Sequence, residues 1–192
     1  WKVIDSVALD KQDIDYLYSL TQNSSIQLTL FDEEHYFVVG ETPSPIVVRD
    51  TGYVFTSPTE ISLEEAVSGK YTMFQAMFLA EKEIVDIFEE KYASDICQRF
   101  SGVRSQDVIY EVMPAGVTKA FALEKLAQKL DIKAEEIMAL GDANNDLEML
   151  KFAGLGIAMG NASDYVKSLA NDVTDSNDEN GVAKAIEKYL LN

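Results

Sequence analysis

The sequence is poor in cysteine, in positive charge and in long apolar runs, and each shortage excludes a class of protein. Its one cysteine, Cys97, cannot form an internal disulfide, which argues against a disulfide-stabilised secreted domain and indicates a reducing cytoplasm. Lysine and arginine number 16 against 33 acidic residues, so the net charge of −17 disfavours nucleic acid or an anionic membrane as partner. The longest nearly apolar stretch, 71–80, has about half of the roughly 20 residues that a membrane-spanning helix needs. We therefore expect a soluble, cytoplasmic protein; no pattern indicates its oligomeric state.

Residues 1–112 mix strand and helix patterns without strict alternation. Asp10 and Asp13 predict the start of a helix that runs to about residue 21, and residues 40–68 form a loop-rich section with a short helix near 62–68. Further patterns predict strands over 2–8, 26–31, 35–39, 71–79, 96–103 and 108–113, and a helix over 81–92. This mixture predicts an α+β domain.

Residues 113–192 follow a different pattern, with a boundary expected at about 112–116. Helices are predicted over 118–130, 145–152, 163–170 and 181–191, and strands over 137–140, 155–159 and 172–174. Strict alternation of this kind predicts a parallel sheet with right-handed crossovers. A sheet of only three strands would leave a long unpaired edge, so we expect part of it to lie outside this sequence.

Two carboxylates follow the strand predicted at 137–140. Asp142 and Asp146 lie in a turn with Asn144 and Asn145, at the end of a parallel strand where α/β sheets build ligand sites. Such hard oxygen ligands suit Mg²⁺, which takes one or two carboxylates and completes its shell with water and phosphate oxygens. In the alternative interpretation, Asp142 only caps the following helix and Asp146 adds acidic charge to its first turn.

Lys119 lies at the predicted start of the helix over 118–130. A lysine there is unfavourable to the helix dipole, so a bound anion would explain its position. An ordinary solvated lysine is the alternative.

Four motifs then occur in order, and together they resemble the C-terminal part of the Cof-type haloacid dehalogenase (HAD)-like phosphatases of subfamily IIB. The motifs are Gly116-Val-Thr-Lys119, Leu140-Gly-Asp-Ala-Asn-Asn-Asp-Leu-Glu-Met-Leu150, Ala153-Gly-Leu-Gly-Ile-Ala-Met-Gly-Asn-Ala162 and Asn177-Asp-Glu-Asn-Gly-Val-Ala-Lys184. The resemblance implies an α/β fold: a partial, Rossmannoid parallel sheet of the HAD-like core over 113–192, and a smaller α+β cap domain of type C2B over 1–112.

The resemblance also implies roles for single residues. Lys119 matches the catalytic lysine that pairs with the nucleophilic aspartate and binds the phosphoryl group. Asp142 matches the Mg²⁺ ligand of the fourth motif, and Asp146 the second acid, which binds metal directly or through water. Asn145 matches the amide that helps to hold the phosphate side of the site. The implied cofactor is Mg²⁺, and the implied substrate is a small phosphorylated metabolite such as a sugar phosphate.

One element of the family pattern is absent from this sequence. Family members begin with a strand that ends in D-x-D-G-T, whose first aspartate is the nucleophile. The only D-x-D here, Asp13-Ile14-Asp15, is followed by Tyr16 and has helical neighbours. Because the chain also opens on Trp1 within a β-like run, we expect the nucleophile-bearing segment to be missing and the chain alone to be inactive.

The resemblance therefore implies a Mg²⁺-dependent phosphatase that works through an aspartyl-phosphate. The alternative is a truncated, inactive HAD-like fragment that at most binds a metal or a partner. A P-type ATPase, whose hinge resembles residues 141–146, is disfavoured because no membrane segment is predicted.

Overall fold

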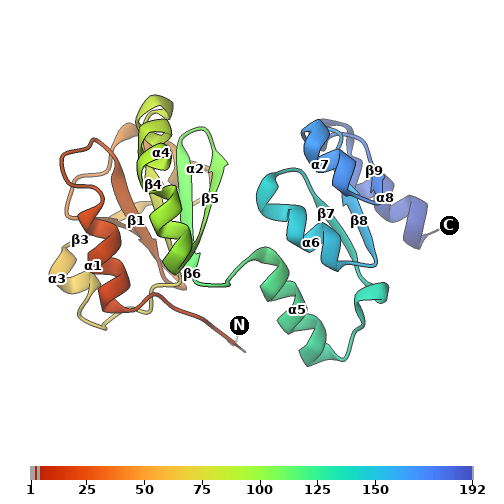
Figure 1. The fold of residues 1–192 in the computed structure, drawn as a ribbon, viewed down its shortest axis with the longest axis horizontal. Helices are drawn as coiled ribbons and strands as arrows, with labels where there is room; N and C mark the ends of the chain where they lie inside the picture. The colour runs from red at the N-terminus through yellow and green to blue at the C-terminus, as the bar shows by residue number, and fades with distance from the viewer. Residues whose placement is uncertain (1–2, 4, 192) are drawn as a thin grey trace. The chain divides into compact units, whose positions relative to one another are not determined.

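The computed structural model describes residues 3 and 5–191, and it divides the chain between Val117 and Thr118 into two compact units (Figure 1). Each unit is built on a sheet of its own, of six strands in the first and three in the second. The roles predicted for the two parts, a cap over 1–112 and half of a core over 113–192, stay predictions.

The first unit is built on a mixed sheet in the order β3-β2-β1-β4-β6-β5. Its strands are β1 (Gln27–Phe31), β2 (Tyr36–Val39), β3 (Pro58–Ile61), β4 (Gln75–Leu79), β5 (Phe100–Gln106) and β6 (Ile109–Pro114). β2 and β3 pair in parallel, and all other neighbours pair antiparallel. Strands and helices therefore combine as the α+β prediction requires.

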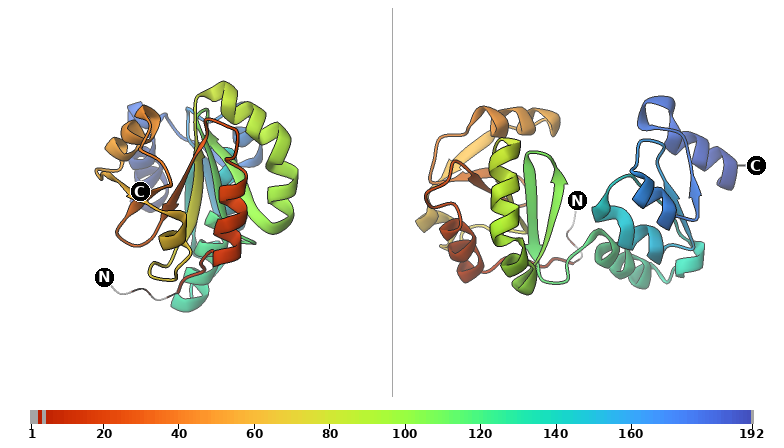
Figure 2. Two further views of the ribbon diagram at one scale, coloured as in Figure 1. Left: turned by 90° about the vertical axis from the view of Figure 1, so that its left-hand side faces the viewer. Right: turned by 45° about the horizontal axis from the view of Figure 1, so that its top comes forward.

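Alternation along β1 directs side chains to both faces of this sheet. Leu28 and Leu30 belong to the larger core, beneath α1 (Lys11–Ser19) and α4 (Lys82–Arg99). The smaller core, under α2 (Pro45–Tyr53), lies on the opposite face and includes Val38 and Met77. Figure 2 shows α1 and α4 on one side of the sheet and α2 on the other. Both faces are thus covered, although α2 covers only part of its face.

Several local predictions for the first unit are confirmed. Asp10 caps α1, and it exchanges hydrogen bonds with Asp13 in a capping box. The strands predicted over 26–31 and 35–39 are β1 and β2, which pair antiparallel with Thr29 opposite Val38. The short helix predicted near 62–68 is α3 (Leu63–Ala66), capped by Ser62.

Other predictions for this unit are wrong. The section 40–68 also contains α2 and β3; Pro45 reads as a loop signal but stands at the start of α2, where its missing N–H costs nothing. The strand predicted over 96–103 begins too early, since residues 96–99 form the last turn of α4, where Ile96 is buried at helical spacing from Val85 and Phe88. Residues 100–103 do belong to a strand, β5. The strand predicted over 2–8 is absent from residues 3 and 5–8, where Val3 and Val7 are exposed; residues 2 and 4 lie outside the described residues.

The second unit confirms the predicted alternation and the parallel sheet. Its strands, in the order β7-β8-β9, are β7 (Met138–Gly141), β8 (Leu155–Ala158) and β9 (Asp172–Val173). Its helices are α5 (Lys119–Leu130), α6 (Leu147–Phe152), α7 (Asp164–Leu169) and α8 (Gly181–Leu190), with short 3-10 turns η1 (Ala134–Glu136), η2 (Asn144–Asp146) and η3 (Asn177–Glu179). Its core is small and rich in alanine, with Leu150 and Val166 as its larger members.

In the described part of the chain, no helix combines the length and the apolar character needed to cross a membrane. The longest helix, α4, carries charged side chains along its length.

Close packing of α6 on β8 leads to a stability prediction. A Cβ atom on Gly156 would come within 2.8 Å of the Leu150 carbonyl carbon, closer than van der Waals contact allows. We expect Gly156→Ala to lower the free energy of unfolding by about 1–3 kcal/mol, the usual cost of overpacking. Urea denaturation followed by circular dichroism measures this change.

Gly52→Ala is the matched control, because nothing lies within 4 Å of the added methyl group and Gly52 is helical. It should be neutral or stabilising by less than about 1 kcal/mol. If both alanine variants are as stable as the unaltered protein, the close approach of α6 to β8 is wrong.

Candidate functional site

The candidate site of the second unit lies at the carboxyl end of β7, where the chain turns through η2 into α6. Asp146 is only 3% exposed, and its carboxylate accepts three hydrogen bonds. Lys119 Nζ donates to Oδ1 at 2.6 Å, and the backbone amides of Asp142 and Ala143 donate to Oδ2 at 2.9 and 3.2 Å. Asp146 therefore closes the turn and ties it to α5.

Gly141 makes this arrangement possible. A Cβ atom at position 141 would lie 2.7 Å from the carboxyl carbon of Asp146, so any larger residue would displace the buried carboxylate. The glycine that ends β7 is needed because the Asp146 side chain folds back against the end of the strand.

Lys119 is the first residue of α5, after the N-cap Thr118, whose hydroxyl accepts a hydrogen bond from the Phe121 amide. Its ammonium forms an ion pair with Asp146 at 2.6 Å. The Lys119 side chain is still 53% exposed, so a ligand can reach it. The carboxylate offsets a positive charge that the helix N-terminus alone would disfavour.

The charge state of Asp146 follows from these contacts. Burial acts to raise the pKa of the Asp146 carboxyl, but hydrogen bonds from Lys119 and the two amides, together with the Lys119 charge, outweigh burial and lower that pKa below its ordinary value of 3.8. Asp146 is therefore ionised at neutral pH and holds Lys119 as a fixed ion pair.

Asp142, in contrast, is exposed, and it is not the N-cap of η2 or of α6, so this part of the alternative interpretation is wrong. Asp146 does add acidic charge to the first turn, as that interpretation proposed. Asn161 Nδ2 donates to Asp142 Oδ2 at 2.9 Å. Asn161 is a site residue that the sequence patterns did not identify. A signal was present, because Asn161 follows β8 as Asp142 follows β7, and the ends of neighbouring parallel strands meet at one edge of a sheet.

Asn145 completes the set of oxygen atoms. Its side-chain Oδ1 is buried and has no hydrogen-bond partner among the residues that the structure describes. A buried acceptor without a donor is costly, so this atom is suited to a ligand.

These residues fit Mg²⁺ better than a cation that needs a full protein cage. Asp142 and Asn145 offer hard oxygens, whereas both oxygens of Asp146 already accept hydrogen bonds. Residues 3 and 5–191 contain no group of three or more His, Cys, Asp or Glu side chains that could hold a metal. A site with few carboxylates suits Mg²⁺, which keeps water and substrate oxygens in its shell. The roles predicted for Lys119, Asp142, Asn145 and Asp146 stay predictions.

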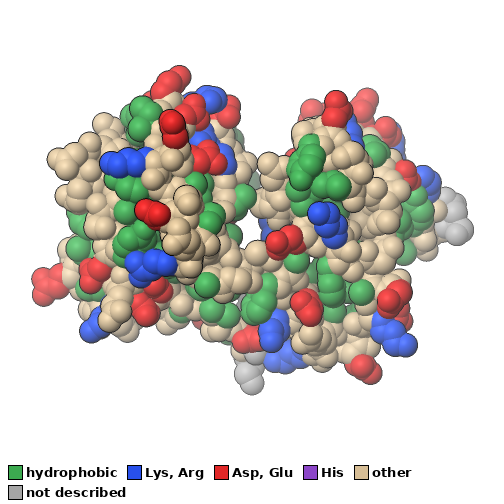
Figure 3. Space-filling view, viewed as in Figure 1, with side chains coloured by type: hydrophobic (Ala, Val, Ile, Leu, Met, Phe, Trp, Pro, Cys, Tyr) green, Lys and Arg blue, Asp and Glu red, His purple; other side chains and the backbone are tan. Residues whose placement is uncertain are grey.

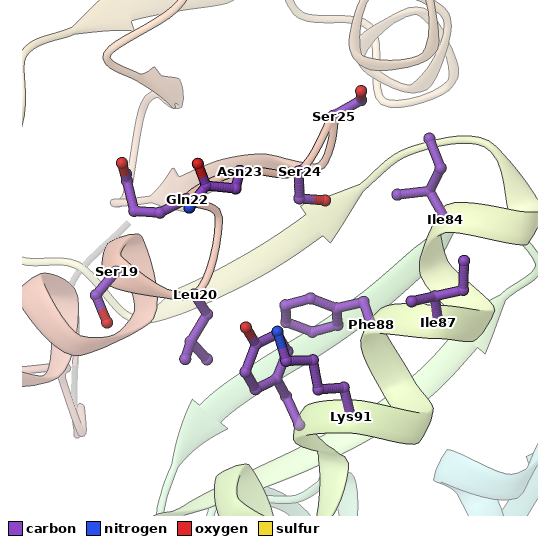
Figure 4. A pocket seen from close by; sticks show the side chains of 11 residues that line it. Ser19, Leu20, Gln22, Asn23, Ser24, Ser25, Ile84, Ile87, Phe88 and Lys91 are labelled. Atoms are coloured by element: carbon purple, nitrogen blue, oxygen red, sulfur yellow. The ribbon is translucent and has the colours of Figure 1, made fainter.

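The first unit contains a separate pocket of about 530 Å³ between residues 19–25 and α4 (Figure 4). Leu20 and Phe88 contribute apolar surface, and Lys91 is the charged residue of its lining. Lys91 already lies 4.6 Å from the centre of the Tyr92 ring. None of the predicted site residues lines this pocket.

Comparisons with known proteins show the family of this chain. The sequence profile of the haloacid dehalogenase-like hydrolases matches residues 1–186. The proposed phosphatase YxeH of Bacillus subtilis (strain 168) is 30% identical over 190 residues, which are 99% of this chain and 70% of YxeH. Both the HAD-like family and the α/β fold expected from the sequence are therefore confirmed.

Solved structures give the same result. BT1666 from Bacteroides thetaiotaomicron, described among phosphatases of the HAD superfamily, has a TM-score of 0.78 and 34% identity, over 97% of this chain and 67% of its own. BT4131, described as a HAD subclass IIB sugar phosphatase, has a TM-score of 0.80 and 25% identity, over 98% of this chain and 70% of its own. Nearly the whole chain is matched, and the comparisons do not bear out the expectation that it is inactive alone.

The lowered pKa of Asp146 predicts how stability depends on pH. A carboxyl whose pKa is lower in the folded state adds stability above its unfolded pKa, and this contribution is lost as the pH falls below about 3.8. Asp146→Asn should therefore be less stable at pH 7 and should lose less stability on acidification than the unaltered protein. Urea denaturation across a pH series measures both effects.

Asp164→Asn provides the control, because Asp164 is an exposed acid in the first turn of α7. It should retain the acid sensitivity of the unaltered protein. The same loss on acidification in all three proteins would show that the contacts of Asp146 do not stabilise the fold.

Proposed function

We propose a function from the fact that this chain belongs to the haloacid dehalogenase-like hydrolase family, whose sequence profile matches residues 1–186. The protein is a Mg²⁺-dependent phosphatase that hydrolyses small phosphorylated metabolites, such as sugar phosphates, through an aspartyl-phosphate. The observation that carries the proposal is the Lys119–Asp146 ion pair beside the exposed carboxylate of Asp142.

Phosphoryl transfer needs neutralisation of charge and precise positioning more than it needs covalent help from the protein. Lys119 can donate to a phosphoryl oxygen, because its ammonium is fixed by Asp146 while about half of its side chain stays exposed. Asp146, which is held ionised, keeps this lysine in place as the phosphoryl group arrives and leaves. Mg²⁺, when bound, would neutralise further negative charge on the phosphoryl oxygens.

Asp142 would hold the metal, with the buried Oδ1 of Asn145 as a second protein oxygen near it in the turn. Asp146 would bind the metal directly or through water. Its carboxylate also accepts from Lys119 and two amides, so the same side chain fixes the lysine and the backbone of the turn.

The attacking aspartate is not among these residues. The sequence contains no D-x-D followed by glycine, so the proposal places the nucleophile in a segment that this sequence does not include. The chain spans 70% of the length of YxeH, which leaves room for such a segment in a protein of that size.

The nature of the substrate is supported by charge and by one relative. With a net charge of −17, and with Lys and Arg side chains interspersed among acidic ones on the face in Figure 3, a small metabolite is favoured over nucleic acid or a membrane surface. The description of BT4131 as a sugar phosphatase supports sugar phosphates as the first class to test. The proposal places this reaction in the cytoplasm, in keeping with the single cysteine.

A direct assay tests the function. Release of phosphate from p-nitrophenyl phosphate and from a panel of sugar phosphates should be measured for this chain and for the full protein that its gene encodes, with Mg²⁺ and with EDTA. We expect the full protein to turn over at least one sugar phosphate with Mg²⁺ and to lose that activity with EDTA. No turnover by the full protein would favour a fragment or relative that only binds a metal or a partner.

Asp142→Ala tests the proposed metal ligand within the full protein. Because the change removes the carboxylate that would bear Mg²⁺, we expect Mg²⁺-dependent hydrolysis to fall at least about 100-fold, while circular dichroism stays unchanged. Asp164→Ala, a matched change at an exposed acid, should retain full activity. Ordinary activity of Asp142→Ala at ordinary Mg²⁺ would remove Asp142 from the metal site.

A further inference from the structure

Asn161 and Asn177 lie in the last two of the four motifs in the sequence. The structure connects them to Asp142 through one side chain. Asn161 donates from Nδ2 to Asp142 Oδ2 at 2.9 Å, and its Oδ1 accepts from the backbone amide of Asn177 at 3.1 Å. Asn161 therefore bridges a carboxylate at the end of β7 and the first residue of η3.

The two contacts fix which way the Asn161 amide faces. The backbone N–H of Asn177 can only donate, so the atom that it meets must be the Asn161 oxygen. The Nδ2 group is then directed at Asp142, where an ionised carboxylate can only accept. The orientation follows from this pairing of donors and acceptors.

The segment that holds the Asn177 amide is itself fixed. The Gly160 amide donates to the Asp175 carbonyl at 3.0 Å, and the Gly181 amide to the Ser176 carbonyl at 2.9 Å. The Thr174 hydroxyl donates to the Gly181 carbonyl at 2.7 Å, and Lys184 of α8 forms an ion pair with Asp175. The segment 174–181 is thus anchored to the end of β8 and to the start of α8, so the Asn177 amide is a fixed point of reference.

A neutral donor on one oxygen of Asp142 has a specific consequence. The hydrogen bond from Asn161 engages Oδ2, and it leaves the negative charge of the carboxylate uncompensated, unlike the charge of Asp146 beside Lys119. An exposed carboxylate without such a partner would sample several rotamers, and binding a cation would have to order it.

We infer that Asn161 is a positioning residue, which holds the Asp142 carboxylate in the orientation that binds Mg²⁺. The inference rests on the proposed function, because it takes Asp142 to be the metal ligand. In this arrangement Asn161 orients the Asp142 carboxylate, and the backbone amide of Asn177 orients the Asn161 side-chain amide.

The test is the Mg²⁺ affinity of the whole chain, measured by titrating the ¹⁵N-labelled protein with MgCl₂ and following its amide NMR signals, a readout that needs no turnover. Loss of an outer partner of a metal ligand typically weakens metal binding 10–100-fold. We expect Asn161→Ala to weaken Mg²⁺ binding about tenfold, with a thermal midpoint close to that of the unaltered chain, because Asn161 is exposed.

Position 177 supplies a matched pair that separates backbone from side chain. Asn177→Ala keeps the backbone N–H and should bind Mg²⁺ as the unaltered chain does. Asn177→Pro removes this N–H and should weaken binding as Asn161→Ala does. Proline is compatible with the position, because residue 177 begins η3 and Ser176 before it has the extended conformation that proline requires (φ −69°, ψ 167°).

The outcomes distinguish the positioning role of Asn161 from the proposed metal site at Asp142. If the unaltered chain binds Mg²⁺ and Asn161→Ala binds it equally well, the positioning role is wrong while the proposed metal site stands. If Asn177→Ala weakens binding as much as Asn177→Pro, the role of the backbone amide is wrong. If the unaltered chain shows no Mg²⁺ shifts around Asp142, the proposed metal site fails and the inference fails with it. Should Asn161→Ala not fold, the pair at position 177 decides whether the positioning role holds.

Discussion

The buried carboxylate of Asp146 is the interaction on which the candidate site depends. It closes the turn that leads from the end of β7 through η2, and it joins this turn to the first residue of α5, 27 residues earlier in the sequence. A carboxylate that is 3% exposed is stable only because a lysine and two amides replace the water that it has lost. The same contacts fix Lys119, so the folding of the turn also places the Lys119 ammonium.

The two aspartates of the site differ in how their negative charge is balanced. Asp146 is paired and low in pKa, whereas Asp142 is exposed and held by the neutral amide of Asn161. Gly141 allows the arrangement, because it leaves space for the Asp146 side chain against the strand.

The first unit depends on a different physical constraint, the covering of both faces of one sheet. Its larger core lies under α1 and α4, and its smaller core under α2. The buried hydroxyl of Tyr36 donates a hydrogen bond to Asp50. Burial is the main cause that raises the pKa of Tyr36, and the negative charge of Asp50 adds to it. The role of this unit as a cap stays a prediction.

The sequence by itself determined the alternating second unit, the strands β1 and β2, the cap of α1 and the residues of the β7 turn, because each rests on periodicity or on contacts within a few residues. Only the tertiary structure decided that α4 runs to Arg99, that Pro45 starts a helix and that Asn161 contacts Asp142. Asn161 lies 19 residues beyond Asp142, and Lys119 lies 27 residues before Asp146. Contacts of that range exist only after parallel strands are in register, and no local propensity encodes which side chains will then meet at their common edge.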